Sequence, residues 1–228
     1  MGKLLELARS RPLLQVAIDL TSIGRAMAVA LEASRAGAHV IEVGTPLIKV
    51  WGAAAVEAVS QGVGERSVVL ADTKTADAAR VELEPLIRAG ASAVTVLGLC
   101  SPEIIEEALS IASEMGADLV VDLIHVDNPV DRALKLAELG ARVFELHVGV
   151  DVQKRRGLDA RALLSEVEEL SRSGIVVAVA GGIKPSNAGE FVARGARIVV
   201  IGGAIYRAEN PFEATRRALE SIEAAASR

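Results

Sequence analysis

The stretch LQVAIDLTSIGRAMAVALEASRAGAHVIEV, residues 14–43, contains one full copy of the pattern that decides the fold. The aliphatic run Leu14–Asp19 predicts a buried strand, and the residues after Ser22 carry apolar side chains at helical spacing. Ala36–Ala38 then places a glycine behind the helix, and His39–Val43 is a second aliphatic run. This order predicts a strand, a crossover helix and a neighbouring parallel strand.

The same pattern continues along the whole chain. Six further strands are expected, at Ser67–Ala71, Ala93–Leu97, Leu119–Asp122, Val143–His147, Val176–Ala180 and Ile198–Ile201. Helices are expected after Ser22, Pro46, Thr75, Pro102, Asn128, Asp159, Pro185 and Pro211. Eight such units in 228 residues predict an α/β fold, a compact single-domain (β/α)8 TIM barrel over residues 1–228.

A doubly wound open sheet is the alternative architecture. Its dinucleotide-binding members carry a glycine-rich fingerprint in the first turn between strand and helix. Residues Ile18–Ser22 read IDLTS and contain no glycine. The barrel is therefore the favoured prediction.

Composition excludes several classes of protein. The chain has 25 Lys and Arg against 30 Asp and Glu, a net charge of −5, and no dominant basic stretch, so we expect no nucleic-acid partner. No apolar run approaches the roughly twenty residues that span a bilayer, so we expect a cytoplasmic protein with no membrane partner. The single cysteine, Cys100, excludes an intramolecular disulfide and a cysteine-based zinc site.

Charged residues gather where the first three predicted strands end. Asp19, Glu42 and Asp72 each close an aliphatic run, and Lys74 and Asp77 follow Asp72. In a TIM barrel the carboxyl ends of the strands form the active-site rim. Carboxylates crowded there repel one another unless a lysine or a divalent ion neutralises them. Alternation along a strand predicts that Asp72 and Lys74 point to the same side.

Paired glycines follow the last two predicted strands. Gly181 and Gly182 follow the seventh strand, and Gly202 and Gly203 follow the eighth. Glycine lets backbone N–H groups approach phosphate oxygens closely, and TIM barrels often bind phosphate at these loops. We therefore expect a phosphate site here, to which Arg207 adds charge.

The sequence resembles the orotidine phosphate decarboxylase superfamily over nearly its whole length, and within it the 3-hexulose-6-phosphate synthase / keto-gulonate phosphate decarboxylase group. The motifs that carry the resemblance are LQVAIDL (14–20), IEVGTP (41–46), the Asp72, Lys74 and Asp77 segment, TVLG (95–98), HVGVDVQ (147–153), AGGI (180–183) and IGG (201–203).

Three positions separate the members of this superfamily. Where this chain has Glu42, the metal-independent nucleotide decarboxylases carry a lysine, so the resemblance favours the metal-dependent branch. The keto-gulonate phosphate decarboxylases carry arginines at the places of Val150 and Gly203. Since arginine at a bidentate site is not readily replaced, these positions favour the synthases.

The resemblance implies a Mg²⁺-dependent aldol condensation of ribulose 5-phosphate with formaldehyde, which gives 3-hexulose 6-phosphate through an enediolate and is reversible. A decarboxylase of a phosphorylated keto acid and a non-catalytic phosphosugar-binding barrel are the alternatives. The implied roles are His147 as the base, Lys74 as the oxyanion-stabilising group, Asp19 as a ligand of a substrate hydroxyl, Glu42 and Asp72 as the metal ligands, and Asp77 as a residue that crosses into the neighbouring site of a homodimer.

Other polar residues are expected to be structural. His39 opens a strand at the end away from the rim, and His125 lies just past the fifth strand. The basic run Lys154–Arg156 is predicted to be a solvated loop.

Overall fold

The computed structural model describes residues 2–227, and its centre is a closed barrel of eight parallel strands. Each strand pairs with the next, and β8 closes the barrel by pairing with β1. This architecture confirms the predicted TIM barrel. The strands are β1 (Leu13–Ile18), β2 (Val40–Val43), β3 (Val68–Thr75), β4 (Ala93–Leu97), β5 (Asp118–Asp122), β6 (Val143–His147), β7 (Val176–Ala180) and β8 (Ile198–Ile201).

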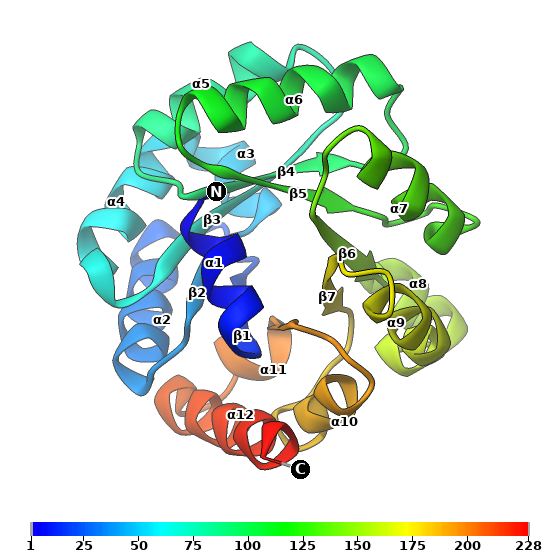
Figure 1. The fold of residues 1–228 in the computed structure, drawn as a ribbon. Coiled ribbons are helices and arrows are strands. Elements are labelled where there is room, and N and C mark those ends of the chain that lie inside the picture. The colour runs from blue at the N-terminus through cyan, green and yellow to red at the C-terminus, as the bar shows by residue number, and fades with distance from the viewer. Residues whose placement is uncertain (1, 228) are drawn as a thin grey trace.

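Helices form a ring outside the barrel (Figure 1). In chain order they are α2 (Ile23–Ala36), α3 (Thr45–Trp51), α4 (Ala53–Val63), α5 (Ala79–Arg88), α6 (Pro102–Glu114), α7 (Pro129–Glu138), α8 (Val150–Arg156), α9 (Leu164–Ser171), α10 (Ala188–Ala193), α11 (Gly203–Tyr206) and α12 (Pro211–Ala226). Short 3₁₀ turns lie at η1 (Gly64–Arg66), η2 (Ala160–Leu163) and η3 (Pro185–Asn187). Among the described residues, no helix combines the length and the apolar character needed to cross a membrane.

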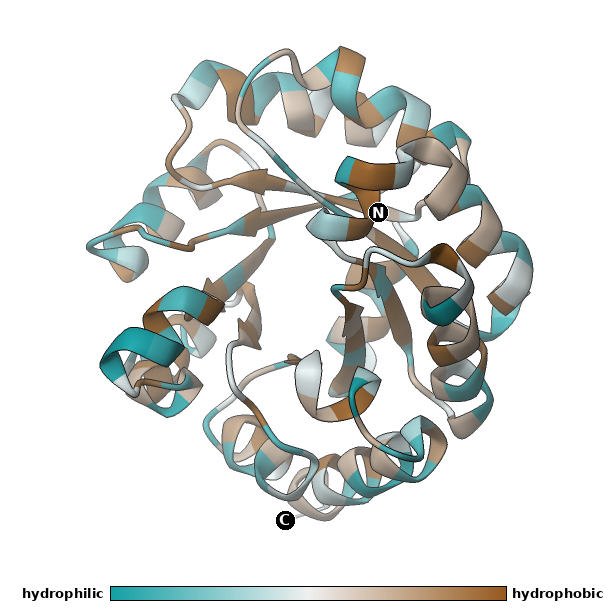
Figure 2. Ribbon diagram, turned by 180° about the vertical axis from the view of Figure 1, so that it is seen from behind, coloured by the Kyte–Doolittle hydropathy of each residue, from teal (hydrophilic) through white to brown (hydrophobic). Residues whose placement is uncertain are grey.

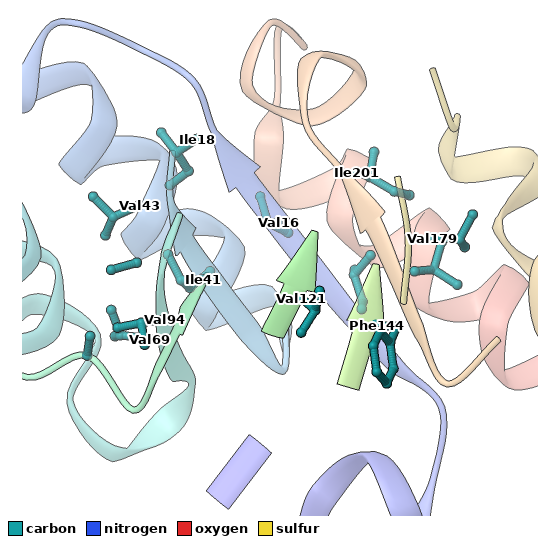
Figure 3. Packing of buried hydrophobic residues seen from close by; sticks show 14 of the residues in the cluster. Val16, Ile18, Ile41, Val43, Val69, Val94, Val121, Phe144, Val179 and Ile201 are labelled. Carbon is teal, nitrogen blue, oxygen red and sulfur yellow. The ribbon is translucent and has the colours of Figure 1, made fainter. Parts of the chain in front are cut away.

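The main hydrophobic core lies between the barrel and the helices. Outward-facing strand residues such as Val16, Ile41 and Phe144 are fully buried there (Figure 3). Small residues of α2, including Ala30 and Ala33, pack against β1 and β2 with no exposed surface. The strands are mostly apolar, whereas the helices carry alternating apolar and polar bands (Figure 2). This pattern fits strands covered on both faces and helices covered on one.

One further helix, α1 (Lys3–Ser10), closes the amino-terminal end of the barrel. It lies across the centre of the ring in Figure 1. Leu4 and Leu5 pack on strand residues that face the interior of the barrel at this end. The buried Asp118 carboxylate accepts hydrogen bonds from the backbone N–H groups of Gly2 (3.0 Å), Leu4 (2.8 Å) and Leu5 (3.1 Å). These bonds satisfy N–H groups that a helix start leaves without partners.

Replacement of Asp118 by alanine is expected to lower the free energy of unfolding by about 1–3 kcal/mol, because several buried N–H groups lose their acceptor. Urea unfolding followed by circular dichroism measures this loss. Asp118→Asn keeps one acceptor oxygen and should lose less. Equal stability of Asp118→Ala and the natural chain would contradict this role for the carboxylate.

Several elements differ from the sequence prediction. β3 continues to Thr75, and α5 begins only after Ala78, which has a left-handed backbone (φ 50°). The helix predicted after Pro46 is two helices separated at Gly52, where φ is 57°. The prediction of a loop at Lys154–Arg156 is wrong, because these residues form the exposed last turn of α8.

Candidate active site

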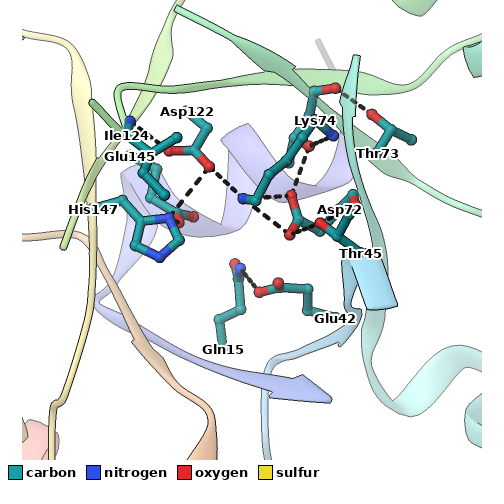
Figure 4. Close-up of polar contacts among 11 residues, drawn as sticks. Gln15, Glu42, Thr45, Asp72, Thr73, Lys74, Asp122, Ile124, Glu145 and His147 are labelled. Atoms are coloured by element: carbon teal, nitrogen blue, oxygen red, sulfur yellow. Dashed lines mark hydrogen bonds and ion pairs between the residues drawn. The ribbon is translucent and has the colours of Figure 1, made fainter. Parts of the chain in front are cut away.

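A layer of polar side chains lies inside the barrel near the carboxyl ends of the strands. They extend toward one another from different strands (Figure 4). All are buried except His147, which is partly exposed. The layer consists of Gln15 on β1, Glu42 on β2, Asp72 on β3, Thr95 on β4, Asp122 on β5, and Glu145 and His147 on β6.

Lys74 links two carboxylates of this layer. Its Nζ lies 3.1 Å from Asp72 and 2.5 Å from Oδ2 of Asp122. Burial acts to lower the pKa of Lys74, but the charges of Asp122 and Asp72 outweigh it and raise that pKa above its usual value. The ammonium therefore remains a fixed positive charge inside the layer.

The backbone at Lys74 departs from a regular strand. The register of β3 with β4 shifts between Ala71 and Thr75, and Lys74 has a φ of 48°. The Lys74 N–H donates to Oγ1 of Thr95 at 2.9 Å. Asp72 and Lys74 meet as expected, but through an irregular strand end and not through simple alternation.

Asp72 is held by hydrogen bonds on both carboxylate oxygens. Oγ1 of Thr45 donates to Oδ2 at 2.6 Å, and Oγ1 of Thr95 donates to Oδ1 at 2.8 Å. With Lys74 as a third donor, the carboxylate has one fixed orientation. Thr45 and Thr95 were not predicted as site residues, although both lie in motifs that the sequence analysis singled out.

Asp122 is a site residue that the sequence analysis missed. Its Oδ1 accepts from the Ile124 N–H at 2.9 Å, and its Oδ2 lies 3.3 Å from Nδ1 of His147. Burial acts to raise the pKa of Asp122, but the hydrogen bond and charge of His147, together with Lys74, lower it to about 2. Asp122 is therefore ionised at neutral pH. Its place at the end of a predicted strand was a usable signal.

Glu145 was also missed. It is buried, and its Oε1 lies 3.2 Å from Nδ1 of His147. Burial raises the pKa of Glu145 well above its usual value, and the charges of Asp122 and Glu42 add to the effect. His147 thus has two carboxyl groups beside one ring nitrogen, while Nε2 is on the other side of the ring.

Glu42 is a buried carboxyl group whose surroundings disfavour its ionised form. It accepts a hydrogen bond from Nε2 of Gln15 at 2.6 Å. Burial raises the pKa of Glu42 well above its usual value, and the charges of Asp72 and Asp19 raise it further. A divalent cation beside Glu42 and Asp72 would remove this repulsion, and carboxylate oxygens are the ligands that Mg²⁺ prefers. The donor chemistry therefore fits the expected ion.

A second set of side chains also has ligand atoms close together. Those of Asp122, Glu145 and His147 all lie within 4.8 Å of one another. The Lys74 ammonium lies 2.5 Å from Asp122 and 3.1 Å from Asp72, so its charge opposes a cation beside either of them. Among the described residues, Glu42 has no cation at ion-pair distance. Glu42 and Asp72 remain the predicted metal ligands.

Two predicted acidic residues lie outside the buried layer. Asp19 is exposed at the end of β1, close to Gly44, where a Cβ atom would lie 2.2 Å from Oδ1 of Asp19. Asp77 is exposed between β3 and α5. In the described chain, Asp77 makes none of the contacts that join Lys74 to Asp72 and Asp122, so its role in a dimer stays a prediction.

Gly181 and Gly203, one from each glycine pair, differ in the space available for a side chain. Gly181 has a φ of 117°, and a Cβ atom there would lie 2.5 Å from the Val148 carbonyl oxygen. A Cβ atom on Gly203 would meet nothing nearer than 3.8 Å, where the Arg207 guanidinium lies. The fold therefore requires a glycine at 181, whereas at 203 it leaves open space beside a cation.

The other residues predicted for the phosphate site are Gly182, Gly202 and Arg207. Gly182 has a φ of 71° and lies against Gln153 and Asp159. Gly202 joins β8 to α11. Arg207 is exposed and lies over the Tyr206 ring, 5.2 Å from its centroid.

His39 has a structural role at the other end of the barrel, as expected. Its Nδ1 accepts from the Leu14 N–H at 2.9 Å. Burial, aided by the Arg11 charge, lowers the pKa of His39 to about 4, so the ring is neutral at physiological pH. His125 is exposed in the turn after β5, with a left-handed backbone (φ 63°).

Comparisons with known proteins agree with the fold. The chain is 36% identical over 209 residues to 3-hexulose-6-phosphate synthase of Mycobacterium gastri, covering 92% of this chain and 99% of that protein. A crystal structure of 3-hexulose-6-phosphate synthase superposes with a TM-score of 0.86 at 37% identity, covering 92% of this chain and 99% of that one. A 3-keto-L-gulonate-6-phosphate decarboxylase from Vibrio cholerae gives a TM-score of 0.82 at 25% identity, covering 94% and 98%.

These similarities identify the chain as an enzyme of the lyase type, with an aldehyde-lyase reaction, and disfavour a non-catalytic barrel. The sequence profile of the orotidine 5′-phosphate decarboxylase / HUMPS family matches residues 12–218. The chain belongs to this family.

Proposed function

We propose that the protein catalyses the Mg²⁺-dependent aldol condensation of ribulose 5-phosphate with formaldehyde to give 3-hexulose 6-phosphate, reversibly and through an enediolate. The observation that carries this proposal is the cluster in which four buried carboxyl groups meet a lysine and a histidine at one barrel rim, all of them from the four strands β2, β3, β5 and β6. Similarity to the named synthases supports the choice of reaction.

His147 is the proposed base. Its Nδ1 faces Asp122 and Glu145, which leaves Nε2 to take a proton from C1 of the sugar phosphate. The carbanion that remains is an enediolate, whose C1 attacks the formaldehyde carbon to form the new carbon–carbon bond. The proton held on His147 can return to the new alkoxide, which balances the reaction.

Lys74 is proposed to stabilise the oxyanion. Its ammonium is held by Asp72 and Asp122, so little reorganisation is needed when negative charge develops nearby. Asp19, exposed at the rim, is proposed to bind a substrate hydroxyl.

Glu42 and Asp72 are proposed to hold Mg²⁺. When bound there, the ion would supply electrostatic stabilisation of the two enediolate oxygens. Gln15, Thr45 and Thr95 fix the directions of the two carboxyl groups through the hydrogen bonds described above.

The decisive test is formaldehyde-dependent consumption of ribulose 5-phosphate by the purified protein. Activity is expected with Mg²⁺, and EDTA is expected to abolish it until excess Mg²⁺ is restored. Undiminished activity in EDTA would reject the metal role. Release of carbon dioxide from 3-keto-gulonate 6-phosphate, without use of formaldehyde, would replace the synthase assignment by the decarboxylase.

The phosphate site gives a separate prediction from a matched pair of variants. Gly203→Ala should leave stability within about 0.5 kcal/mol, because the added methyl group meets no near neighbour. It should raise KM for ribulose 5-phosphate several-fold, because the methyl group enters the space beside Arg207. Gly181→Ala should instead lose about 1–3 kcal/mol of stability, because of its left-handed backbone and the clash with Val148. Thermal unfolding and steady-state kinetics measure both effects, and an unchanged KM in Gly203→Ala would place the phosphate elsewhere.

The proposal also includes a cytoplasmic homodimer with shared sites. Asp77 is exposed and so free to reach a partner subunit. Sedimentation equilibrium tests the assembly. Mixing inactive Asp77→Ala with inactive His147→Ala tests the sharing, since mixed dimers would regain one complete site.

A further inference from the structure

Glu145 is a buried carboxyl group that the proposed reaction does not itself use. Its side chain is 8% exposed. Along the barrel it lies between Asp122 on β5 and Ala178 on β7. Within residues 2–227, its one close polar contact is Nδ1 of His147, at 3.2 Å. An apolar side chain of similar volume would fill the same space without the cost of removing a carboxyl group from water.

Asp122 uses one carboxylate oxygen to contact both His147 and Lys74. Its Oδ2 lies 2.5 Å from the Lys74 ammonium but 3.3 Å from Nδ1 of His147. The stronger contact of this oxygen is therefore with Lys74. The hydrogen bond of Nδ1 is made to Asp122, but Oε1 of Glu145 lies at a similar distance, 3.2 Å, and no cation competes for it at ion-pair distance among the described residues.

We propose that Glu145 is a positioning residue that, together with Asp122, holds His147 in the tautomer with its proton on Nδ1, so that Nε2 carries the free lone pair. The inference rests on the proposed role of His147 as the base. A ring in the other tautomer would present an N–H to the substrate at Nε2 and could not remove a proton.

The effect does not depend on the ionisation of Glu145. A carboxylate has two acceptor oxygens, and a neutral carboxyl group still has its carbonyl oxygen. The proposal requires that an oxygen without a proton faces Nδ1, since an O–H there would donate to the ring and favour the other tautomer. The charged groups that act on Glu145 are Asp122 on β5, Glu42 on β2, and Lys74 and Asp72 on β3, besides His147 on its own strand. Glutamine, which resembles a neutral glutamic acid, can therefore substitute for it.

The test compares Glu145→Met with Glu145→Gln. In the ligand-free protein, ¹⁵N NMR of the His147 ring should show Nδ1 protonated in the natural chain and in Glu145→Gln, and a mixture of tautomers in Glu145→Met. In the formaldehyde assay, Glu145→Met should lose about ten- to a hundredfold in kcat with little change in KM, whereas Glu145→Gln should retain most of kcat. Unfolding measurements confirm that each variant is folded.

The outcomes separate this inference from the proposed reaction. Unchanged ring signals and kcat in Glu145→Met would overturn the inference, because Glu145 would then serve only to fill space. The ring signals require no substrate. If they shift as expected while the natural chain does not consume formaldehyde, the positioning role stands and the proposed reaction fails.

Discussion

Replacement of Lys74 by methionine is expected to lower stability more than any other single change in the site, and to lower turnover as well. Lys74 neutralises Asp72 and Asp122, whose side chains are only 8% and 1% exposed. Removal of one member of a buried ion pair costs about 3–5 kcal/mol, because the remaining charge has no partner. Loss of an oxyanion-stabilising group lowers kcat by ~10²–10³-fold. Urea unfolding and the formaldehyde assay measure the two effects.

The stability loss in Lys74→Met should depend on pH. The pKa of Asp122 is lowered to about 2 in the folded protein from an ordinary value of 3.8. The stability that this shift contributes is complete above pH 3.8 and is lost as the pH falls toward 2. The deficit of Lys74→Met should therefore be largest near neutral pH and smaller near pH 3.

A double variant provides the control. Lys74→Met with Asp122→Asn removes the cation and one buried negative charge together, so it should recover part of the lost stability without recovering turnover. If Lys74→Met alone were as stable as the natural chain, the ion pairs would contribute nothing to the fold.

Replacement of His147 by alanine is expected to lower kcat by ~10²–10⁴-fold, the usual contribution of a positioned acid–base group. The fold should persist, since the ring lies partly exposed at the end of β6 and is not part of the apolar core. The direct readout is exchange of the C1 proton of ribulose 5-phosphate with deuterated solvent, without formaldehyde. This exchange should be lost in the variant.

His39 offers a matched control. His39→Ala removes a histidine whose Nδ1 accepts from a backbone N–H at the far end of the barrel. It should reduce stability but leave kcat of the folded protein unchanged. Persistent C1 exchange in His147→Ala, or global unfolding of that variant, would contradict the role of His147 as the base.

Much of the barrel could be predicted from the sequence because its strands are short aliphatic runs bounded by glycine and polar residues. The bounds of β4, β6, β7 and β8 agree with the prediction to the residue. The end of β3 does not, since Lys74 and Ala78 adopt left-handed backbones that favour glycine. The irregular backbone occurs where Lys74 forms its ion pairs with Asp72 and Asp122. Tertiary contacts of this kind are not encoded in a local sequence pattern.

The site was only partly predictable for a related reason. Every residue of β5 is buried, so alternation does not reveal which side chains face the interior of the barrel. The place of Asp122 at a strand end puts it at the rim, but no local pattern shows that it lies beside Lys74, 48 positions away in the chain. Glu145 lies between apolar residues of β6, which is buried except for His147, and was overlooked for the same reason. The helix α1 was missed because its place depends on Asp118, more than a hundred residues away.

The closure of the barrel floor by α1 has a kinetic consequence. Leu4, Leu5 and Ala8 pack against strand residues that face the interior at this end of the barrel, so the described chain covers that side. We expect small molecules to enter and leave at the same place, the rim formed by the carboxyl ends of the strands. A departing sugar phosphate therefore obstructs the next arrival, and the end product should act as a competitive inhibitor of its own formation.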